Sequence, residues 1–193
     1  MLILASQSPR RRELLGLITD QFLVRPTGCD ESFACPDPAE HARQLALRKC
    51  AAAVDAQPLD PADAVIAADT VVFLDGVLLE KPRTEEEACT MLRRLSGNTH
   101  VVCTGVAVAY GGETRSFVQQ TRVTFRHLSD DLITRYVATG EPMDKAGAYG
   151  IQGRGALLVE GIAGDYFNVV GLPVSALYRL LLEMGVPLEG SAL

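Results

Sequence analysis

Leu2-Ile3-Leu4-Ala5, a short apolar run, leads through Ser6-Gln7-Ser8-Pro9-Arg10-Arg11-Arg12 into Glu13-Leu14-Leu15. This order predicts a buried strand followed at once by a helix that begins near Pro9, because proline is favoured at the first helical position. A helix start exposes backbone N–H groups, and Ser6, Ser8 and the arginines add donors that suit phosphate oxygens. The alternative is a strand-to-helix turn with a solvated basic face, and this stretch alone favours neither interpretation.

Composition limits the kind of protein and its partners. The chain has 193 residues, 48% of them hydrophobic, which fits a single domain spanning residues 1–193 with a core of its own. The net charge of −6 disfavours nucleic acid and anionic membranes as partners, so the arginines are a local positive charge suited to a small anionic ligand. We expect a cytoplasmic protein, because no window approaches the roughly 18 apolar residues of a membrane span and the first apolar run is too short for a signal peptide.

Helical and strand patterns alternate along the chain, which favours an α/β architecture. The five cysteines include no C-x-x-C pair, so we expect reduced, structural thiols. We expect strands over residues 2–5, 22–24, 64–74, 77–79, 99–110 and 114–125, and helices over residues 38–55, 84–95, 129–140 and 173–184.

Asp69 is the second feature with chemical content. It follows Val65-Ile66-Ala67-Ala68 in an otherwise apolar strand, where a carboxylate is costly unless it is paired, bound to a metal or open to a cleft. Asp69 is therefore a candidate general base. The alternative is an aspartate whose oxygens accept backbone hydrogen bonds in a turn before Val71.

Two lysines are candidate phosphate ligands. Lys81 lies in Leu79-Glu80-Lys81-Pro82, and a hairpin turn at Asp75-Gly76 can return it to the side of Asp69. Lys49 lies late on the helix over residues 38–55. Either could instead be a solvated lysine at a strand end or on a helix surface.

A glycine-rich stretch over residues 145–155 contains Gln152, whose amide offers both a donor and an acceptor. That pair suits the imide edge of uracil or thymine, although a loop glutamine is often simply hydrated. Gly147-Ala148-Tyr149-Gly150 is not a dinucleotide-binding fingerprint, and the sequence has no G-x-x-x-x-G-K-[ST], which disfavours a P-loop kinase or ATPase.

Taken in order, these residues resemble the Maf (septum formation) family of nucleoside triphosphate pyrophosphatases over nearly the whole chain. The segment 144–153 is similar to the branch that acts on dTTP and UTP rather than on methylated GTP. The stretches that carry the resemblance are Ser6-Gln7-Ser8-Pro9-Arg10-Arg11, Asp30-Glu31, Lys49, Ala68-Asp69-Thr70-Val71, Glu80-Lys81-Pro82, Ser96-Gly97, Thr104-Gly105-Val106, Asp144-Lys145-Ala146-Gly147-Ala148-Tyr149-Gly150-Ile151-Gln152-Gly153 and Gly171-Leu172-Pro173.

The resemblance implies a single-domain, mixed-sheet α/β fold of the inosine-triphosphatase-like (Maf/Ham1) type with a central cleft. It implies hydrolysis of the α–β phosphate bond of dTTP, UTP or a modified pyrimidine nucleotide, which gives the monophosphate and pyrophosphate, with Mg²⁺ or Mn²⁺ as the divalent metal cation. It also allows a homodimer.

Residue roles follow from the same resemblance. Asp69 is implied as the proton acceptor, Glu31, Lys49 and Lys81 line the phosphate and metal site, and Arg10, Arg11, Thr70 and Gln152 bear on substrate choice. Ser6 and Ser8 join them as substrate-binding candidates from the first strand-to-helix junction. Glu31 and Asp69 are the expected metal ligands, and whether Asp69 takes a proton or binds the metal stays open.

Two other functions are compatible with the same residues. A nucleotide-binding regulator of cell division would hold the triphosphate without cleaving it, but a carboxylate among the cations would then repel the ligand unless a metal intervened. A nucleotidyl or phosphoryl transferase would need a second substrate pocket, which no stretch of the sequence indicates.

Overall fold

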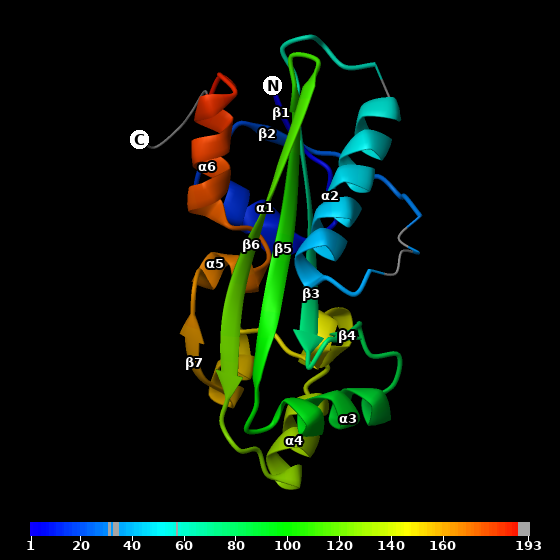
Figure 1. Cartoon of the computed structure of the whole chain (residues 1–193), viewed down its shortest axis with the longest axis vertical. Helices are drawn as coiled ribbons and strands as arrows, with labels where there is room; N and C mark the ends of the chain where they lie inside the picture. Colours follow the sequence, from blue (N-terminus) through cyan, green and yellow to red (C-terminus); the bar gives the residue numbers. More distant parts are fainter. Residues whose placement is uncertain (31, 33–34, 57, 189–193) are drawn as a thin grey trace.

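β3 (Ala64–Leu74) is the central strand of this computed structural model, which describes residues 1–30, 32, 35–56 and 58–188 (Figure 1). The described strands form one mixed sheet in the order β2-β1-β3-β5-β6-β7, and β4 also pairs with β3. β1 runs parallel to β2 and β3, and the remaining pairs are antiparallel. The other strands are β1 (Leu2–Leu4), β2 (Phe22–Val24), β4 (Val77–Leu79), β5 (Thr99–Tyr110), β6 (Glu113–Phe125) and β7 (Val159–Ala163).

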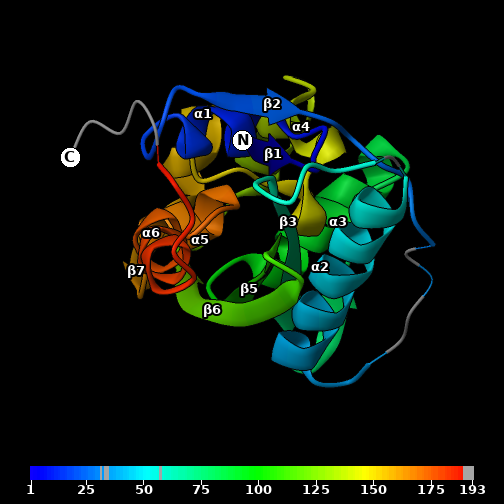
Figure 2. The same cartoon turned by 90° about the horizontal axis from the view of Figure 1, so that it is seen from above.

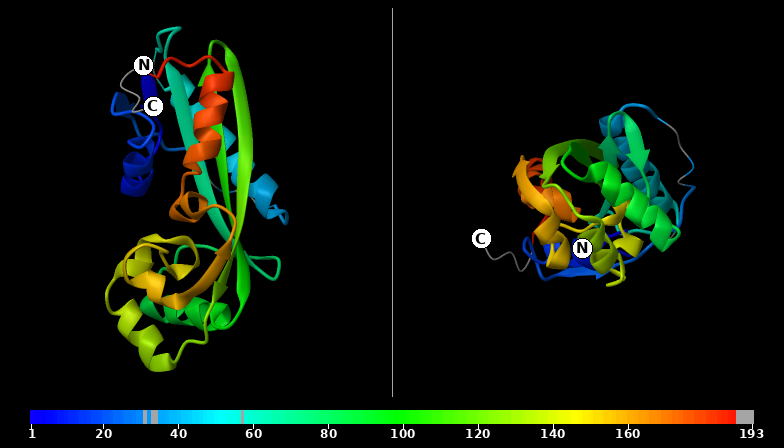
Figure 3. Two further views of the ribbon diagram at one scale, coloured as in Figure 1. Left: turned by 90° about the vertical axis from the view of Figure 1, so that its left-hand side faces the viewer. Right: turned by 90° about the horizontal axis from the view of Figure 1, so that it is seen from below.

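The helices cover both faces and one end of this sheet. α2 lies on one side of the long strands and α6 on the other, while α3 and α4 lie together at one end (Figures 2 and 3). No helix in the described ranges is long and apolar enough to cross a membrane. The helices are α1 (Pro9–Leu15), α2 (Pro38–Asp55), α3 (Glu85–Leu95), α4 (Asp130–Val137), α5 (Tyr166–Val170) and α6 (Val174–Glu183), with 3₁₀ turns η1 (Glu141–Asp144), η2 (Ala146–Ala148) and η3 (Gly153–Leu158).

The two faces of β3 pack against different helices, because successive side chains of a strand point to opposite faces. Val65 and Ala67 belong to a small buried cluster with Ala46 and Cys50 of α2. Ile66 and its neighbours on the other face belong to the main core, which also contains residues of α1, α3 and α6. Asp69 and Thr70 therefore point to opposite faces of the same strand.

One edge of β3 has a gap in its strand pairing. β5 pairs with the other edge from Val65 to Phe73. On the gapped edge, β1 pairs with residues 64–66 and β4 with residues 72–74. On this edge, no described strand pairs with residues 67–71 between them. The fold thus leaves open the part of the edge that carries Asp69 and Thr70.

The expected single-domain α/β architecture with a mixed sheet is confirmed. The segments predicted at 22–24, 38–55, 64–74, 77–79 and 99–110 have the predicted bounds. Small differences occur at other ends: β1 stops at Leu4, β6 begins one residue earlier at Glu113, α3 begins at Glu85 and α6 at Val174. α4 ends at Val137, short of the predicted residue 140, because a turn closes with the Gly140 N–H bonded to the Val137 carbonyl.

Candidate active site

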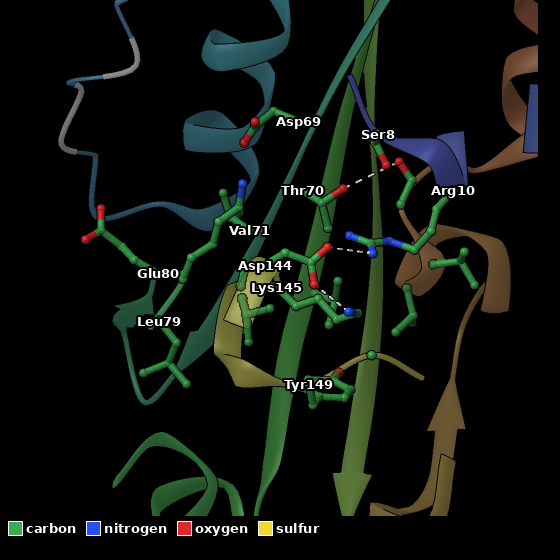
Figure 4. Close-up of a pocket in the computed structure, with 18 of the residues that line it drawn as sticks. Ser8, Arg10, Asp69, Thr70, Val71, Leu79, Glu80, Asp144, Lys145 and Tyr149 are labelled. Carbon is green, nitrogen blue, oxygen red and sulfur yellow. Dashed lines mark hydrogen bonds and ion pairs between the residues drawn. The ribbon is translucent and has the colours of Figure 1, made fainter. Parts of the chain in front are cut away.

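A cleft of about 520 Å³ lies over the open edge of β3 (Figure 4). Small-molecule sites in proteins commonly measure about 300–1,000 Å³, so the cleft has room for a nucleotide-sized ligand. Its walls come from α1, α2, β3, β4, the segment 144–152 and the end of α5. Elements far apart in the sequence thus contribute to one site.

Asp69 is paired with a lysine from α2. The Lys49 ammonium donates to Oδ1 of Asp69 at 2.5 Å, and the two side chains are only 15% and 11% exposed. The alternative of a turn before Val71 is wrong, because β3 runs without interruption to Leu74. A largely buried carboxylate therefore lies at the cleft with a cation in contact.

Lys81 lies two residues after the end of β4 and also lines the cleft, as the hairpin at Asp75-Gly76 predicts. The cation in contact with Asp69 is nevertheless Lys49. The Lys81 side chain is exposed, and no other residue in the described ranges gives it a hydrogen bond or an ion pair. The two lysines thus differ: Lys49 holds Asp69, while the ammonium of Lys81 can contact an incoming anion.

Arg11 connects α1 to the other face of β3. Its Nε donates to the Gly171 carbonyl at 2.9 Å and its Nη2 to the Thr70 hydroxyl at 3.0 Å. Its Nη1 donates to the Ser6 hydroxyl at 3.4 Å. Thr70 also shares a hydrogen bond with Thr104 at 2.9 Å. This network fixes the direction of the Arg11 guanidinium at the cleft wall.

The two candidate serines lie at different depths. Ser8 lines the cleft, and its hydroxyl caps α1 by accepting from the Arg11 N–H at 3.4 Å. Ser6 is buried behind it and accepts from the Ser8 N–H at 3.2 Å. Ser8 can therefore contact a ligand directly, whereas Ser6 supports the junction from inside.

Asp144 joins Arg10 of α1 to the opposite wall. Its carboxylate accepts from Arg10 Nη1 at 3.2 Å and from Lys145 Nζ at 2.5 Å, so it lies between the two cations (Figure 4). Burial raises the pKa of Asp144, but the hydrogen bonds from Lys145 and Arg10 outweigh that effect, and the pKa lies below its ordinary value. Asp144 is therefore ionised at neutral pH.

The floor of the cleft is aromatic. Tyr149 lines it (Figure 4). The Tyr149 hydroxyl shares a 2.7 Å hydrogen bond with Nε2 of buried His100. Burial raises the pKa of the Tyr149 hydroxyl, which stays protonated. Gln152 is half-buried, lines the same cavity and has no side-chain hydrogen bond to any residue that the structure describes. Its amide is available to a ligand.

The structure brings together most of the predicted site residues. The predicted site residue Glu31 lies outside the described residues. The sequence assigned no individual role to Asp144, Lys145 or Tyr149, although all three lie in the segment 144–153 that carries the family resemblance. Their roles can be inferred only from their contacts with residues far away in the sequence. The described lining carries the cations Arg10, Arg11, Lys49, Lys81 and Lys145 and the carboxylates Asp69, Glu80 and Asp144, a positive excess in an acidic protein.

Comparison with known proteins identifies one family and relatives that share one name. Residues 1–184 match the family described as Maf-like protein. The dTTP/UTP pyrophosphatase of Moorella thermoacetica is 53% identical over 192 residues, covering 98% of this chain and 97% of that protein. The dTTP/UTP pyrophosphatase of Thermococcus kodakarensis is 49% identical over 180 residues, covering 93% and 95%. Among solved structures, the Ham1 protein of Staphylococcus aureus aligns with a TM-score of 0.48 and 15% identity, covering 64% of this chain and 71% of that one.

Proposed function

This chain belongs to the Maf family, and from that premise we propose that it hydrolyses dTTP and UTP to the nucleoside monophosphate and pyrophosphate. The observation that carries the proposal is the joint presence, in one cleft, of a largely buried carboxylate and an excess of cations. Its relatives named dTTP/UTP pyrophosphatase match nearly the whole chain, which supports the same activity here.

In the proposed reaction, Asp69 acts on the attacking water. A water that donates to the Asp69 carboxylate is oriented toward the α-phosphorus, and the carboxylate accepts its proton as the new P–O bond forms. The α–β bridging bond breaks, and pyrophosphate leaves with the electron pair. Lys49 fixes the carboxylate, while Lys81 and Arg10 offset the negative charge that develops on the leaving group.

A divalent cation, Mg²⁺ or Mn²⁺, is part of the proposal. Mg²⁺ is commonly held by one or two carboxylates together with substrate phosphates, and the oxygens of Asp69 and Glu80 fit that donor type. The described residues contain no cluster of three or more acidic, histidine or cysteine ligands. Glu31, the other expected metal ligand, lies outside the described residues. When bound, the cation supplies charge neutralisation at the phosphates. Loss of turnover with a chelator, and its return with either metal, tests this part.

We propose that Gln152 recognises the nucleobase. Its unbonded amide matches the carbonyl and N–H groups of the uracil or thymine imide edge, and Tyr149 offers an aromatic surface beside it. Cytosine presents an amino group and a bare ring nitrogen at the same edge. An amide held with its carbonyl toward the uracil or thymine N–H therefore favours UTP and dTTP over CTP, whereas a freely rotating amide would match either edge.

We also propose a cytoplasmic protein that takes a small-molecule triphosphate and no nucleic acid, since the net charge of −6 opposes a polyanion. A homodimer is proposed from the family alone. Measurement of the mass in solution tests the dimer.

The decisive experiment incubates purified protein and Mg²⁺ or Mn²⁺ with dTTP, UTP, CTP, GTP, 7-methyl-GTP and ITP, and scores pyrophosphate and orthophosphate separately. Pyrophosphate together with dTMP or UMP is the expected result. Orthophosphate release would place cleavage at another bond and refute the proposal. Tight triphosphate binding without turnover of any nucleotide would indicate the binding-only regulator instead.

A further inference from the structure

Glu141 lies outside the cleft lining, yet its carboxylate is bound to the segment that carries Gln152. Oε2 accepts from the Arg154 N–H at 3.1 Å, and Oε1 accepts from the Gly155 N–H at 3.0 Å. Both donors come directly after Gln152 and Gly153. A single carboxylate thus holds two consecutive N–H groups on the C-terminal side of Gln152.

Tyr136 of α4 holds the other side of Gln152. Its hydroxyl donates to Oε1 of Glu141 at 3.0 Å and accepts from the Gly150 N–H at 3.2 Å. The Tyr136 side chain is buried, and this burial raises the pKa of its hydroxyl, which therefore stays protonated and able to donate. Glu141 and Tyr136 together hold backbone groups on both sides of Gln152.

Glycines at positions 153 and 155 allow the backbone around Gln152 to lie close to Glu141 and Tyr136. A Cβ at Gly155 would lie 1.9 Å from the Gly150 carbonyl oxygen and 2.8 Å from the Tyr136 hydroxyl. Gly153 has a φ of +62° and would place a Cβ 3.0 Å from Oε2 of Glu141. The loop from Gly150 to Gly155, which we call the glutamine loop, is thus closed on itself and pressed against the two side chains that bind it.

The glutamine loop has no sheet pairing in the described sheet, and its last three residues begin the 3₁₀ turn η3. The contacts with Glu141 and Tyr136 join this turn to the residues on the other side of Gln152. Ile151 is buried on the core side, and Gln152 next to it faces the cleft. The carboxylate contacts are charge-assisted hydrogen bonds, which are about twice as strong as neutral ones. A small rotation of the loop would move the Gln152 amide relative to a base, because amide recognition is directional.

We propose that Glu141 and Tyr136 are positioning residues that fix the glutamine loop and thereby set the preference of Gln152 for the uracil or thymine edge over the cytosine edge. This inference rests on the proposed function for its substrate. The part that concerns the loop is independent of turnover. Neither residue is among those that line the cleft, so we expect the chemical step at Asp69 to stay intact when they are changed.

The test compares Glu141→Gln with the parent protein. An amide cannot accept all three hydrogen bonds, and its NH₂ group would face at least one of the N–H or O–H donors. We expect kcat/KM for UTP to fall about tenfold, the size expected for loss of one charge-assisted bond. The change should lie mainly in KM, while the low kcat/KM for CTP stays within about threefold, so the UTP-to-CTP ratio falls.

Two controls separate positioning from general damage. Glu160→Gln makes the same chemical change at an exposed residue of β7 outside the loop and should leave the ratio unchanged. Tyr136→Phe removes only the hydroxyl and keeps the buried ring, so it should lower the ratio in the same direction; it also serves if Glu141→Gln fails to fold. Tyr178→Phe on α6 is its matched control.

Amide hydrogen exchange provides a readout besides activity. Glu141→Gln should speed exchange at Arg154 and Gly155, and Tyr136→Phe should speed it at Gly150, with β3 and β5 unchanged. Unchanged exchange at these amides would overturn the inference whatever the nucleotide specificity. So would faster exchange with an unaltered UTP-to-CTP ratio, or an equal loss of kcat for every nucleotide. A parent protein that hydrolyses neither UTP nor dTTP would refute the proposed function. The exchange data would still show whether Glu141 and Tyr136 fix the glutamine loop.

Discussion

The ammonium of Lys49 on α2 lies 2.5 Å from the carboxylate of Asp69 on β3. A largely buried ion pair of this kind is costly to break by removing Lys49, because the Asp69 carboxylate then loses the cation that contacts it. The pair therefore has two consequences that can be measured separately, one for turnover and one for stability.

Asp69→Asn should lower kcat by about 10²- to 10⁴-fold, the usual contribution of a positioned proton acceptor. The substituted amide has nearly the same shape, and its oxygen can still accept from Lys49, so the fold should persist. The measurement is pyrophosphate release from UTP beside a circular dichroism spectrum. Near-parental turnover would make Asp69 a structural residue and remove the proposed mechanism.

Lys49→Met and Lys81→Met should separate the roles of the two lysines. Lys49→Met leaves Asp69 without its cation, and we expect unfolding free energy to fall by about 2 kcal/mol and the melting temperature by roughly 4–8 °C. Lys81 is exposed, so Lys81→Met should leave the melting temperature nearly unchanged while raising KM for the triphosphate. Equal melting temperatures for the two variants would show that the Lys49–Asp69 contact contributes nothing to stability.

Local features carried much of the fold prediction. α2 begins where Asp37 caps the helix and Pro38 occupies its first turn, and both features can be recognised in the sequence. The Asp75-Gly76 turn likewise defines the β3–β4 hairpin, with positive φ at both residues. Each of these boundaries depends on neighbours within a few residues, which is why the sequence could predict them.

The site contacts depend on long-range packing, which local patterns do not contain. Asp69 was recognisable because a carboxylate interrupts an apolar strand, but nothing near it indicates that Lys49 is its partner. The hydrogen bonds from the glutamine loop to Glu141 could not be predicted from the sequence either, because an acidic residue before a proline is not a recognisable motif. The resemblance to the Maf family identified the candidate site residues, and the structure shows which of the described ones contact each other.

Gly105→Ala should damage both fold and site. Gly105 is the cross-strand partner of Asp69, and a Cβ there would lie 2.2 Å from the Ala42 carbonyl oxygen on the backbone of α2. Because α2 would have to move away, we expect a loss of about 1–3 kcal/mol in unfolding free energy, measured by urea denaturation.

Movement of α2 should also withdraw Lys49 from Asp69 and reduce turnover of the folded fraction. Gly161→Ala is the matched control, because a Cβ at Gly161 meets no atom within 4 Å. If Gly105→Ala were as stable and active as the control, α2 would have enough freedom to accommodate the methyl group, and the close approach would not matter to the site.

His100 should make stability depend on pH in the mildly acidic range. Burial lowers its pKa from 6.5 to about 4, and its Nδ1 has no hydrogen-bond partner in the described ranges. Below pH 6.5 the unfolded chain binds a proton that the folded protein does not, so unfolding becomes more favourable as pH falls. The expected loss is up to about 3 kcal/mol between pH 6.5 and 4, with no contribution from this residue above that window.

Urea denaturation at half-unit steps from pH 8 to pH 4 measures this loss. His100→Gln removes the titrating group and leaves an amide that can still bond to the Tyr149 hydroxyl, so the slope between pH 6.5 and 5 should largely disappear in that variant. Carboxylates with lowered pKa values, such as Asp144, lose their stabilising charge only below this pH range. They therefore do not contribute to the slope expected from His100. The same slope in both proteins would mean that His100 takes up its proton equally well in the folded state, and that the aromatic floor of the cleft is open to water.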